Sequence, residues 1–163
     1  MRSEGDAHRA IERYADMVWR LCLINLKNPA DAEDVFQNVF MKYVLSSAVF
    51  QSEEHEKAWF IRVTVNACRD LYRSLFRRES VPIDELPELP YNDNNEENRE
   101  VLDAVMALPE KYRYVVYLHY YEGYSAPEIS KILHKNVNTI YTLLTRARNM
   151  LRESLGGDGG YEQ

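Results

Sequence analysis

Residues 125–155, which read SAPEISKILHKNVNTIYTLLTRARNMLRESL, decide the fold of the second half of the chain. Ser125 and Glu128 have the spacing of a capping box, in which serine caps a helix and glutamate stands three residues later. A short helix follows, and the chain breaks at residues 134–136. A longer helix then runs from Val137 to about Leu155, and its inward apolar stripe contains Val137, Ile140, Leu144, Ala147 and Leu151. This layout predicts a helix-turn-helix.

The outward face of the longer helix is polar, and no acid stands between Glu128 and Glu153. A helix that reads DNA needs hydrogen-bonding groups for base edges and cations for phosphates. We predict a groove face that contains Lys135, Asn138, Thr139, Tyr141, Thr142 and Arg146. The pattern alone leaves an alternative open, a helical hairpin packed in a bundle with its cations merely solvated.

Upstream of this motif, Leu108-Pro109-Glu110 opens another helix, because the residue before proline is pushed out of helical geometry. Gly123 is placed to end that helix as a left-handed cap. The helix is rich in tyrosine, and Tyr124 lies just beyond it. We expect the tyrosine rings to pack with their hydroxyls toward water, and a contact face for an inhibitory partner is the alternative.

The first half of the chain also has a helical pattern. Asn28 and Pro29 form a helix start, with an N-cap followed by proline in the first turn. Apolar residues follow at three- and four-residue spacing: Ala32, Val35, Phe36, Val39, Phe40 and Tyr43. Helices over about 7–25 and 54–76 complete a small bundle. Neither half has the alternation of a strand, so we expect an all-α fold.

Charge divides the 163-residue chain into two neutral lobes and an acidic tether. The net charge is −6, and residues 81–100 hold seven acids and one basic residue, with three prolines. Such a segment cannot bury enough surface to fold, so we read it as a flexible linker. The expected domains are 1–80 and 100–155, with a linker at 81–99 and a disordered tail at 156–163.

Other classes of protein fit the composition poorly. No apolar run approaches the roughly 20 residues of a membrane span, so we expect a cytoplasmic protein without membrane insertion. Cys22 and Cys68 are too few for a disulfide framework, and we expect both to be buried. No glycine-rich phosphate loop is present, and the histidines at 8, 55, 119 and 134 lie far apart. We therefore predict no metal and no cofactor.

Five stretches, in order along the chain, resemble motifs of extracytoplasmic-function sigma factors. They begin with DAEDVFQNVF at 31–40, which is similar to the family's polymerase-binding helix, and AWFIRVTVNACRD at 58–70, which is similar to the helix that opens the −10 promoter element. LPEKYR at 108–113, YEGYS at 121–125 and TRAR at 145–148 resemble the domain that reads the −35 element. The resemblance implies a dissociable specificity subunit of bacterial RNA polymerase that performs no catalysis itself.

The resemblance also implies residue roles. Four residues, Asp31, Asp34, Gln37 and Asn38, form a polar face that would bind the β′ clamp of core RNA polymerase, and a solvated helix face is the alternative. The resemblance also implies that the chain contacts the β flap of the polymerase. Contacts to the −10 element would come from Trp59, Phe60, Arg62, Asn66, Arg69 and Arg73. For Trp59, packing in the core is an equal alternative. The loop from Ser46 to Glu54 would lie beside a flipped base.

The resemblance implies two partners besides polymerase, promoter DNA and an anti-sigma factor. The chain departs from the family pattern at His134 and Asn138, where glycine is usual, and at Tyr141 and Leu143, where basic residues are common. The family's −35 sequence preference therefore does not carry over. The competing hypothesis is a free-standing helix-turn-helix regulator whose first lobe dimerises or senses a ligand.

Overall fold

The computed structural model describes residues 1–77 and 96–156, with side chains at 1–74 and 99–156, and these residues form helices and short connections. The chain divides into two compact units, Met1–Leu89 and Pro90–Gln163. The expectation of an all-α fold is confirmed. The acidic tether, over 81–95, and the tail, over 157–163, lie outside the described residues. Among the residues that the structure describes, no helix could span a membrane.

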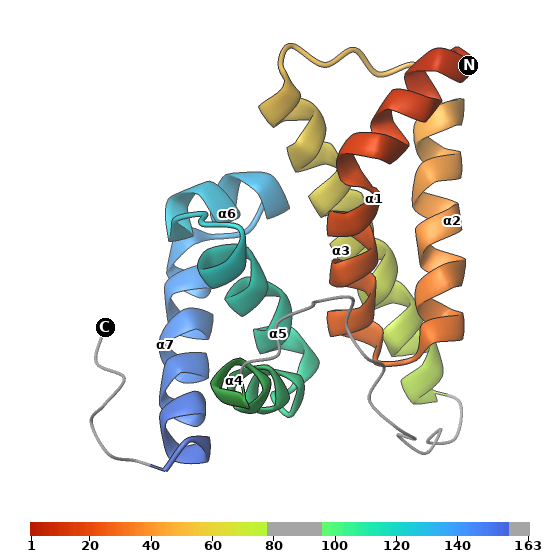
Figure 1. Ribbon diagram of the computed structural model, residues 1–163. Coiled ribbons are helices and arrows are strands. Elements are labelled where there is room, and N and C mark those ends of the chain that lie inside the picture. The colour runs from red at the N-terminus through yellow and green to blue at the C-terminus, as the bar shows by residue number, and fades with distance from the viewer. Residues whose placement is uncertain (78–95, 157–163) are drawn as a thin grey trace. The chain divides into compact units, whose positions relative to one another are not determined.

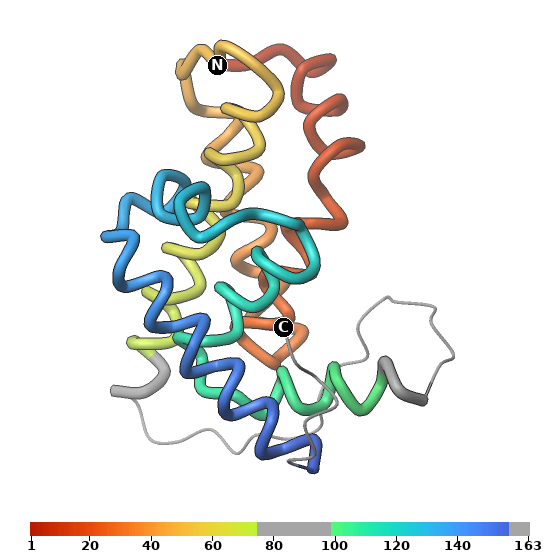
Figure 2. Tube along the Cα trace, turned by 90° about the vertical axis from the view of Figure 1, so that its left-hand side faces the viewer, coloured from red at the N-terminus to blue at the C-terminus, as the bar shows by residue number. Residues whose placement is uncertain are grey.

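In the first unit, helices α1 (Glu4–Leu26), α2 (Pro29–Leu45) and α3 (Glu53–Arg77) lie side by side, and consecutive helices are antiparallel (Figures 1 and 2). The hydroxyl of Ser3 caps α1 by accepting the backbone N–H of Asp6 at 3.1 Å. The side chain of Asn28 caps α2 by accepting the backbone N–H groups of Ala30 and Asp31. The helix start predicted at Asn28 and Pro29 is therefore confirmed.

The core of the first unit is built from the predicted stripe of α2 and from aromatic rings of all three helices. Along the stripe only Phe36 is half-buried, and the buried members are Ala32, Val35, Val39, Phe40 and Tyr43. Phe60 of α3 lies within 5.2 Å of the rings of Tyr14, Phe40 and Tyr43, measured between centroids. Cys22 and Cys68 are fully buried and carry free thiols, as expected.

The second unit contains α4 (Glu96–Met106), α5 (Glu110–Val116), the π-helix η1 (Tyr117–Tyr121), α6 (Ala126–Leu133) and α7 (Val137–Ser154). α4 crosses α5 and α7 (Figures 1 and 2). Their shared core contains Val105, Leu108, Tyr112, Val116 and Ala147, with Leu143 and Leu151 packed against it. The buried guanidinium of Arg113 donates to the Leu108 carbonyl at 3.2 Å, which joins α5 to the chain that leaves α4.

Two local features differ from the expected pattern. The tether was expected to extend to residue 99, but α4 begins at Glu96, so the last residues of the acidic segment are helical. The helix opened by Pro109 widens into η1 before it ends, and Gly123 then adopts a left-handed backbone with φ of 81°, as predicted. The Tyr117 hydroxyl donates to Glu122 at 3.1 Å, which ties the wide turn to the residue after it.

Candidate functional site

The helix-turn-helix of the second unit is held by local hydrogen bonds. The predicted capping box is present: the hydroxyl of Ser125 accepts the Glu128 N–H at 3.2 Å, and the Glu128 carboxylate accepts the Ser125 N–H at 3.0 Å. The hydrogen bond from the Ser125 N–H, followed by that with the Ser125 side chain, holds the pKa of Glu128 below its ordinary value. His134 ends α6 in the left-handed region with φ of 54°, and Asn136 caps α7 through the N–H of Asn138. The turn therefore positions α7 without a glycine.

The outward face of α7 brings together five of the six residues predicted to read DNA. All five are exposed, and they lie within half of the helix circumference at about 100° per residue: Asn138, Thr139, Tyr141, Thr142 and Arg146. The opposite side is buried at Ile140, Leu144 and Ala147. Lys135 differs, because it is half-buried and its ammonium donates to the Tyr114 hydroxyl at 3.2 Å. We therefore treat Lys135 as a brace of the turn.

A second face runs along α3. Residues 62, 66, 69 and 73 recur at three- and four-residue spacing and share one stripe of the helix. Asn66 and Arg73 are exposed, whereas Arg62 and Arg69 are half-buried. An exposed amide between guanidinium groups combines one group that can read a base edge with cations that can hold phosphates.

The two aromatic residues that were expected to contact the −10 element, Trp59 and Phe60, differ in exposure. The Phe60 side chain has no exposed surface, because the rings of α1 and α2 enclose it. It cannot touch DNA in this fold, and we leave it out of the DNA-binding face. Trp59 is half-buried, edge-on to Tyr43 and Phe50 at about 6 Å between centroids, so part of the indole remains accessible.

The third face lies on α2. Asp34, Gln37 and Asn38 are exposed, while Asp31 is half-buried near the helix start. Burial and the nearby Asp34 carboxylate raise the pKa of Asp31 above its ordinary value. Two carboxylates one turn apart at a helix surface form a local negative field that favours a cationic partner.

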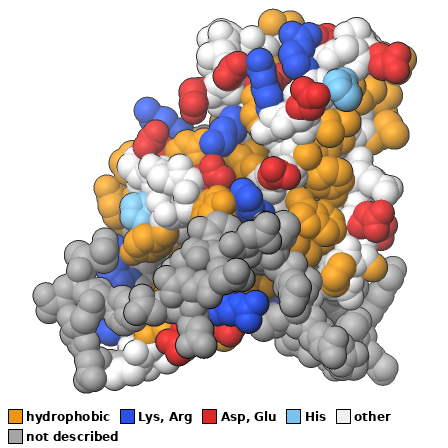
Figure 3. All heavy atoms as spheres, in the orientation of Figure 1, with side chains coloured by type: hydrophobic (Ala, Val, Ile, Leu, Met, Phe, Trp, Pro, Cys, Tyr) orange, Lys and Arg blue, Asp and Glu red, His pale blue; other side chains and the backbone are white. Residues whose placement is uncertain are grey.

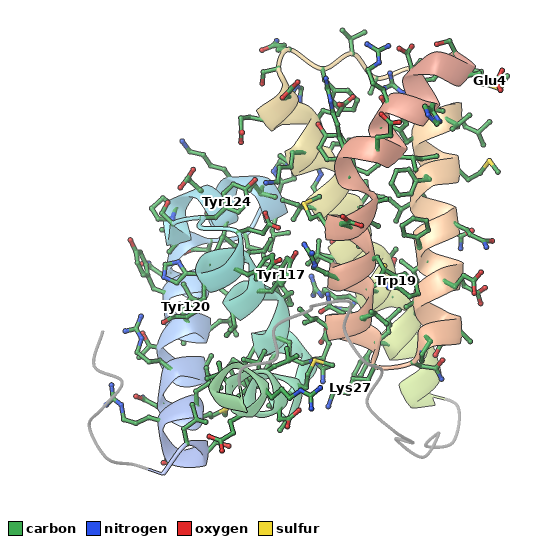
Figure 4. All side chains as sticks on the ribbon, viewed as in Figure 1. Glu4, Trp19, Lys27, Tyr117, Tyr120 and Tyr124 are labelled. Carbon is green, nitrogen blue, oxygen red and sulfur yellow. The ribbon has the colours of Figure 1, made fainter. Side chains whose placement is uncertain are left out.

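An apolar groove beside this face was not found from the sequence. Trp19 of α1 lies on the side that faces α2 (Figure 4), edge-on to the Phe36 ring with centroids 5.9 Å apart. The groove has a volume of about 370 Å³ and is lined by Ala15, Asp16, Trp19, Glu33, Phe36 and Gln37. Figure 3 shows hydrophobic side chains gathered along this seam. The sequence assigned Phe36 to the core, and only the pairing of α1 with α2 places Trp19 beside it.

The sequence matches the family described as Sigma-70 region 2 over residues 10–78 and that described as Sigma-70, region 4 over residues 98–151. RNA polymerase sigma factor SigZ of Bacillus subtilis is 30% identical over 132 residues, which cover 77% of this chain and 73% of SigZ. ECF RNA polymerase sigma factor SigW of the same organism is 25% identical and is aligned over 89% of this chain and 86% of SigW. Among solved structures, the sigma factor RpoE of Bartonella quintana, in complex with the anti-sigma factor NepR, has a TM-score of 0.73 at 22% identity, covering 94% of this chain and 98% of that one.

Two helical units with these matches, in this order along the chain, define an RNA polymerase sigma factor. The chain belongs to the sigma-70 family, and it is a sigma factor of the extracytoplasmic-function type. These matches do not favour a free-standing helix-turn-helix regulator.

Proposed function

We propose that this chain binds core RNA polymerase through α2 and directs it to promoters through α3 and α7. One observation carries the proposal: the two units match regions 2 and 4 in order, and the polar faces of α2, α3 and α7 lie at the surface. One helix face, on α2, would therefore bind polymerase, and two others, on α3 and α7, would bind promoter DNA.

The polymerase contact combines charge with an apolar groove. Asp34, Gln37 and Asn38 supply carboxylate and amide groups, and the groove at Trp19 and Phe36 continues from Gln37. Exposed charges steer association and fix orientation, whereas a partly buried tryptophan supplies most of the binding energy at such contacts. The partner surface on the β′ clamp would then be basic at its edge and apolar at its centre.

The DNA contacts divide into base reading and phosphate holding. On α3, Asn66 would read a base of the −10 element, while Arg62, Arg69 and Arg73 hold the backbone. The loop between α2 and α3 would lie beside the unpaired strand, with the exposed edge of Trp59 behind it. On α7, Asn138, Thr139, Tyr141 and Thr142 face the −35 major groove, and Arg146 holds phosphate. The chain would also contact the β flap of core polymerase.

We further propose an anti-sigma partner, a cytoplasmic location and no catalysis by the chain itself. RpoE of Bartonella quintana was solved in complex with an anti-sigma factor, and the two chains share a fold. A partner that inhibits this chain must cover the α2 face, the basic faces or both, because binding elsewhere leaves polymerase association intact. A pull-down from the native cell, followed by transcription with the captured partner added, tests this. Unchanged transcription at saturating partner would remove the idea.

Co-purification with core polymerase tests the central proposal. A sigma factor should elute with the core enzyme and permit transcription from promoters selected out of a random-sequence library. A free-standing regulator should instead bind palindromic duplex DNA alone, as a dimer. A chain that neither joins the core enzyme nor selects a promoter refutes the proposed function.

A further inference from the structure

Arg2, which precedes α1 and lies outside the region 2 match, holds the loop that joins α2 to α3. Its backbone N–H donates to the Val44 carbonyl at 2.8 Å, and its Nε donates to the Tyr43 carbonyl at 2.9 Å. A terminal guanidinium nitrogen donates to the Ala48 carbonyl. One residue therefore donates hydrogen bonds to two carbonyls in the last turn of α2 and to one carbonyl of the loop.

The same guanidinium stacks on two aromatic rings. Its central carbon lies 4.2 Å from the centroid of the Tyr43 ring and 5.1 Å from that of Phe50. A planar guanidinium can donate hydrogen bonds in its plane while its faces cover aromatic rings, which the ammonium of a lysine cannot do. The Tyr43 and Phe50 rings are nearly parallel, at 12°. The loop is thus tied to α2 through Arg2.

The loop residue between the two tethered positions projects into solvent. Ala48 is bound through its carbonyl and Phe50 through its ring, and Val49 between them is 85% exposed. An exposed valine contributes nothing to the core, so the brace holds an apolar side chain outward. Arg2 and these loop residues also line a cavity of about 250 Å³, together with Tyr43 and residues of α1 and α3.

We propose that Arg2 is a positioning residue for promoter recognition: it holds the α2–α3 loop rigid, so that Val49 is presented to the unpaired strand of the −10 element. This rests on the proposed function, which places the loop beside that strand. The geometry of −10 reading in this chain then depends on a residue outside the part of the sequence that matches region 2. Arg2 acts through the loop and does not contact a base.

The test compares Arg2→Gln with Arg9→Gln. Arg9 lines the same cavity, but its guanidinium pairs with Asp6 at 2.6 Å on the same helix and does not bond to the loop. Amide hydrogen exchange over 47–51 measures how rigidly the loop is held. Fork-junction DNA with an unpaired −10 strand, made from a promoter selected with the wild-type holoenzyme, measures base discrimination. Val49→Ala tests the presented side chain.

We expect the 47–51 amides to exchange about tenfold faster in Arg2→Gln, as the loss of charge-assisted hydrogen bonds implies, and to be unchanged in Arg9→Gln. Base discrimination at one position of the unpaired strand should fall about fivefold in Arg2→Gln and in Val49→Ala, with unchanged affinity for core polymerase. Arg2→Lys keeps the charge without the planar fork and should also loosen the loop. Tryptophan fluorescence confirms that each variant is folded.

Unchanged amide exchange over 47–51 in Arg2→Gln would refute the proposal that Arg2 holds the loop rigid. A loosened loop with wild-type discrimination would overturn the positioning role. Lost discrimination with wild-type loop exchange would also overturn it, because Arg2 would then act on the DNA directly. Failure of the proposed function is distinguishable, because a wild-type chain that selects no promoter leaves the exchange result intact.

Discussion

The phenol of Tyr43 donates to Oε2 of Glu56 at 2.8 Å, which joins the last turns of α2 to the first turn of α3 beneath the loop that connects them. Tyr14 of α1 donates to the other oxygen of this carboxylate at 3.0 Å. Glu56 therefore accepts one hydrogen bond from each of the two helices packed against α3. The three helices meet at a polar point directly beside their aromatic core.

This relationship predicts a loss of stability at alkaline pH. Burial, followed by the hydrogen bond to Glu56, raises the pKa of Tyr43 to about 12, and the same causes raise that of Tyr14. The pKa of an unfolded tyrosine is about 10. Because the folded state holds the proton more tightly, this stabilisation is complete below pH 10 and is lost as the pH rises from about 10 to 12.

We expect Tyr43→Phe to lower the free energy of unfolding by about 1–2 kcal/mol at pH 8, because Oε2 loses its donor. The gap from wild type should narrow as the pH rises past 10. Urea unfolding followed by tryptophan fluorescence measures this, since both tryptophans, Trp19 and Trp59, lie in the first unit. Tyr141→Phe, at an exposed position of the second unit, is the control. An equal gap at pH 8 and pH 11 would contradict the assignment.

The turn of the helix-turn-helix predicts a stabilising substitution. His134 has φ of 54° and ψ of 46°, a conformation that costs a residue with a side chain roughly 1 kcal/mol and that glycine adopts freely. His134→Gly should raise the stability of the second unit by about 0.5–1 kcal/mol, and His134→Val should lower it by a similar amount or more. Amide hydrogen exchange on α6 reports this unit. Equal protection in both variants would show that the turn carries no strain.

Much of this fold follows from sequence because its signals are local. The caps at Asn28 and Ser125, the left-handed Gly123 and the two α7 faces each depend on residues within one or two turns. α4 was missed because its start lies in an acidic segment, and its apolar side gains a partner only when α5 and α7 are in place. The wide turn η1 has no sequence signal of its own.

The candidate sites show the same limit. Periodicity predicted most of the exposed and buried positions on α2 and α7, but Asp31, Phe36, Val137 and Leu151 are half-buried. It could not show that Phe60 is enclosed by rings from two other helices, or that Lys135 bonds to Tyr114, 21 residues earlier. Trp19 and Arg2 contact residues far away in the chain, Phe36 and Tyr43 respectively. The roles that we propose for them therefore could not be predicted before the packing of the helices was known.

Substitutions in the apolar groove and on the polar face of α2 should weaken polymerase binding in two different ways. Trp19→Ala should weaken binding about thirtyfold, since a partly buried tryptophan in a groove is a typical hot spot. Asp34→Asn should weaken it only a few-fold, with an effect that fades at high salt, because an exposed charge is screened. Ile11→Ala on α1 and Asp70→Asn on α3 are exposed controls. Equilibrium binding to core polymerase at two salt concentrations measures all four variants, and a salt-independent loss in Asp34→Asn would contradict this interpretation.

On α3, the loss of the Asn66 amide and the loss of the Arg73 guanidinium should affect promoter binding in different ways. Asn66→Ala should reduce discrimination at one base of the −10 element by about 1–3 kcal/mol, because its amide would read that base edge. Arg73→Ala should weaken all promoters alike and flatten the salt dependence, because it would hold a phosphate. Open-complex formation on promoters with single base changes separates the two. If neither variant alters open-complex formation, the α3 face is structural.

On α7, Asn138 and Arg146 lie on one exposed face and should differ in the same way, with Lys135 as an internal comparison. Arg146→Ala should lower affinity for all −35 sequences and reduce the slope of log affinity against log salt by about 1, because one phosphate contact is lost. Asn138→Ala should leave that slope unchanged and reduce discrimination at one base position.

Lys135→Ala should instead destabilise the second unit, since its ammonium is bonded to the Tyr114 hydroxyl and lies 5.6 Å from the centroid of that ring. Lys111→Ala, an exposed cation on α5, is the charge-matched control. Holoenzyme binding to −35 duplexes across salt, with hydrogen exchange on the second unit, measures all four. A slope that falls equally in Arg146→Ala and Lys111→Ala would mean that net charge, and not the α7 face, holds the DNA.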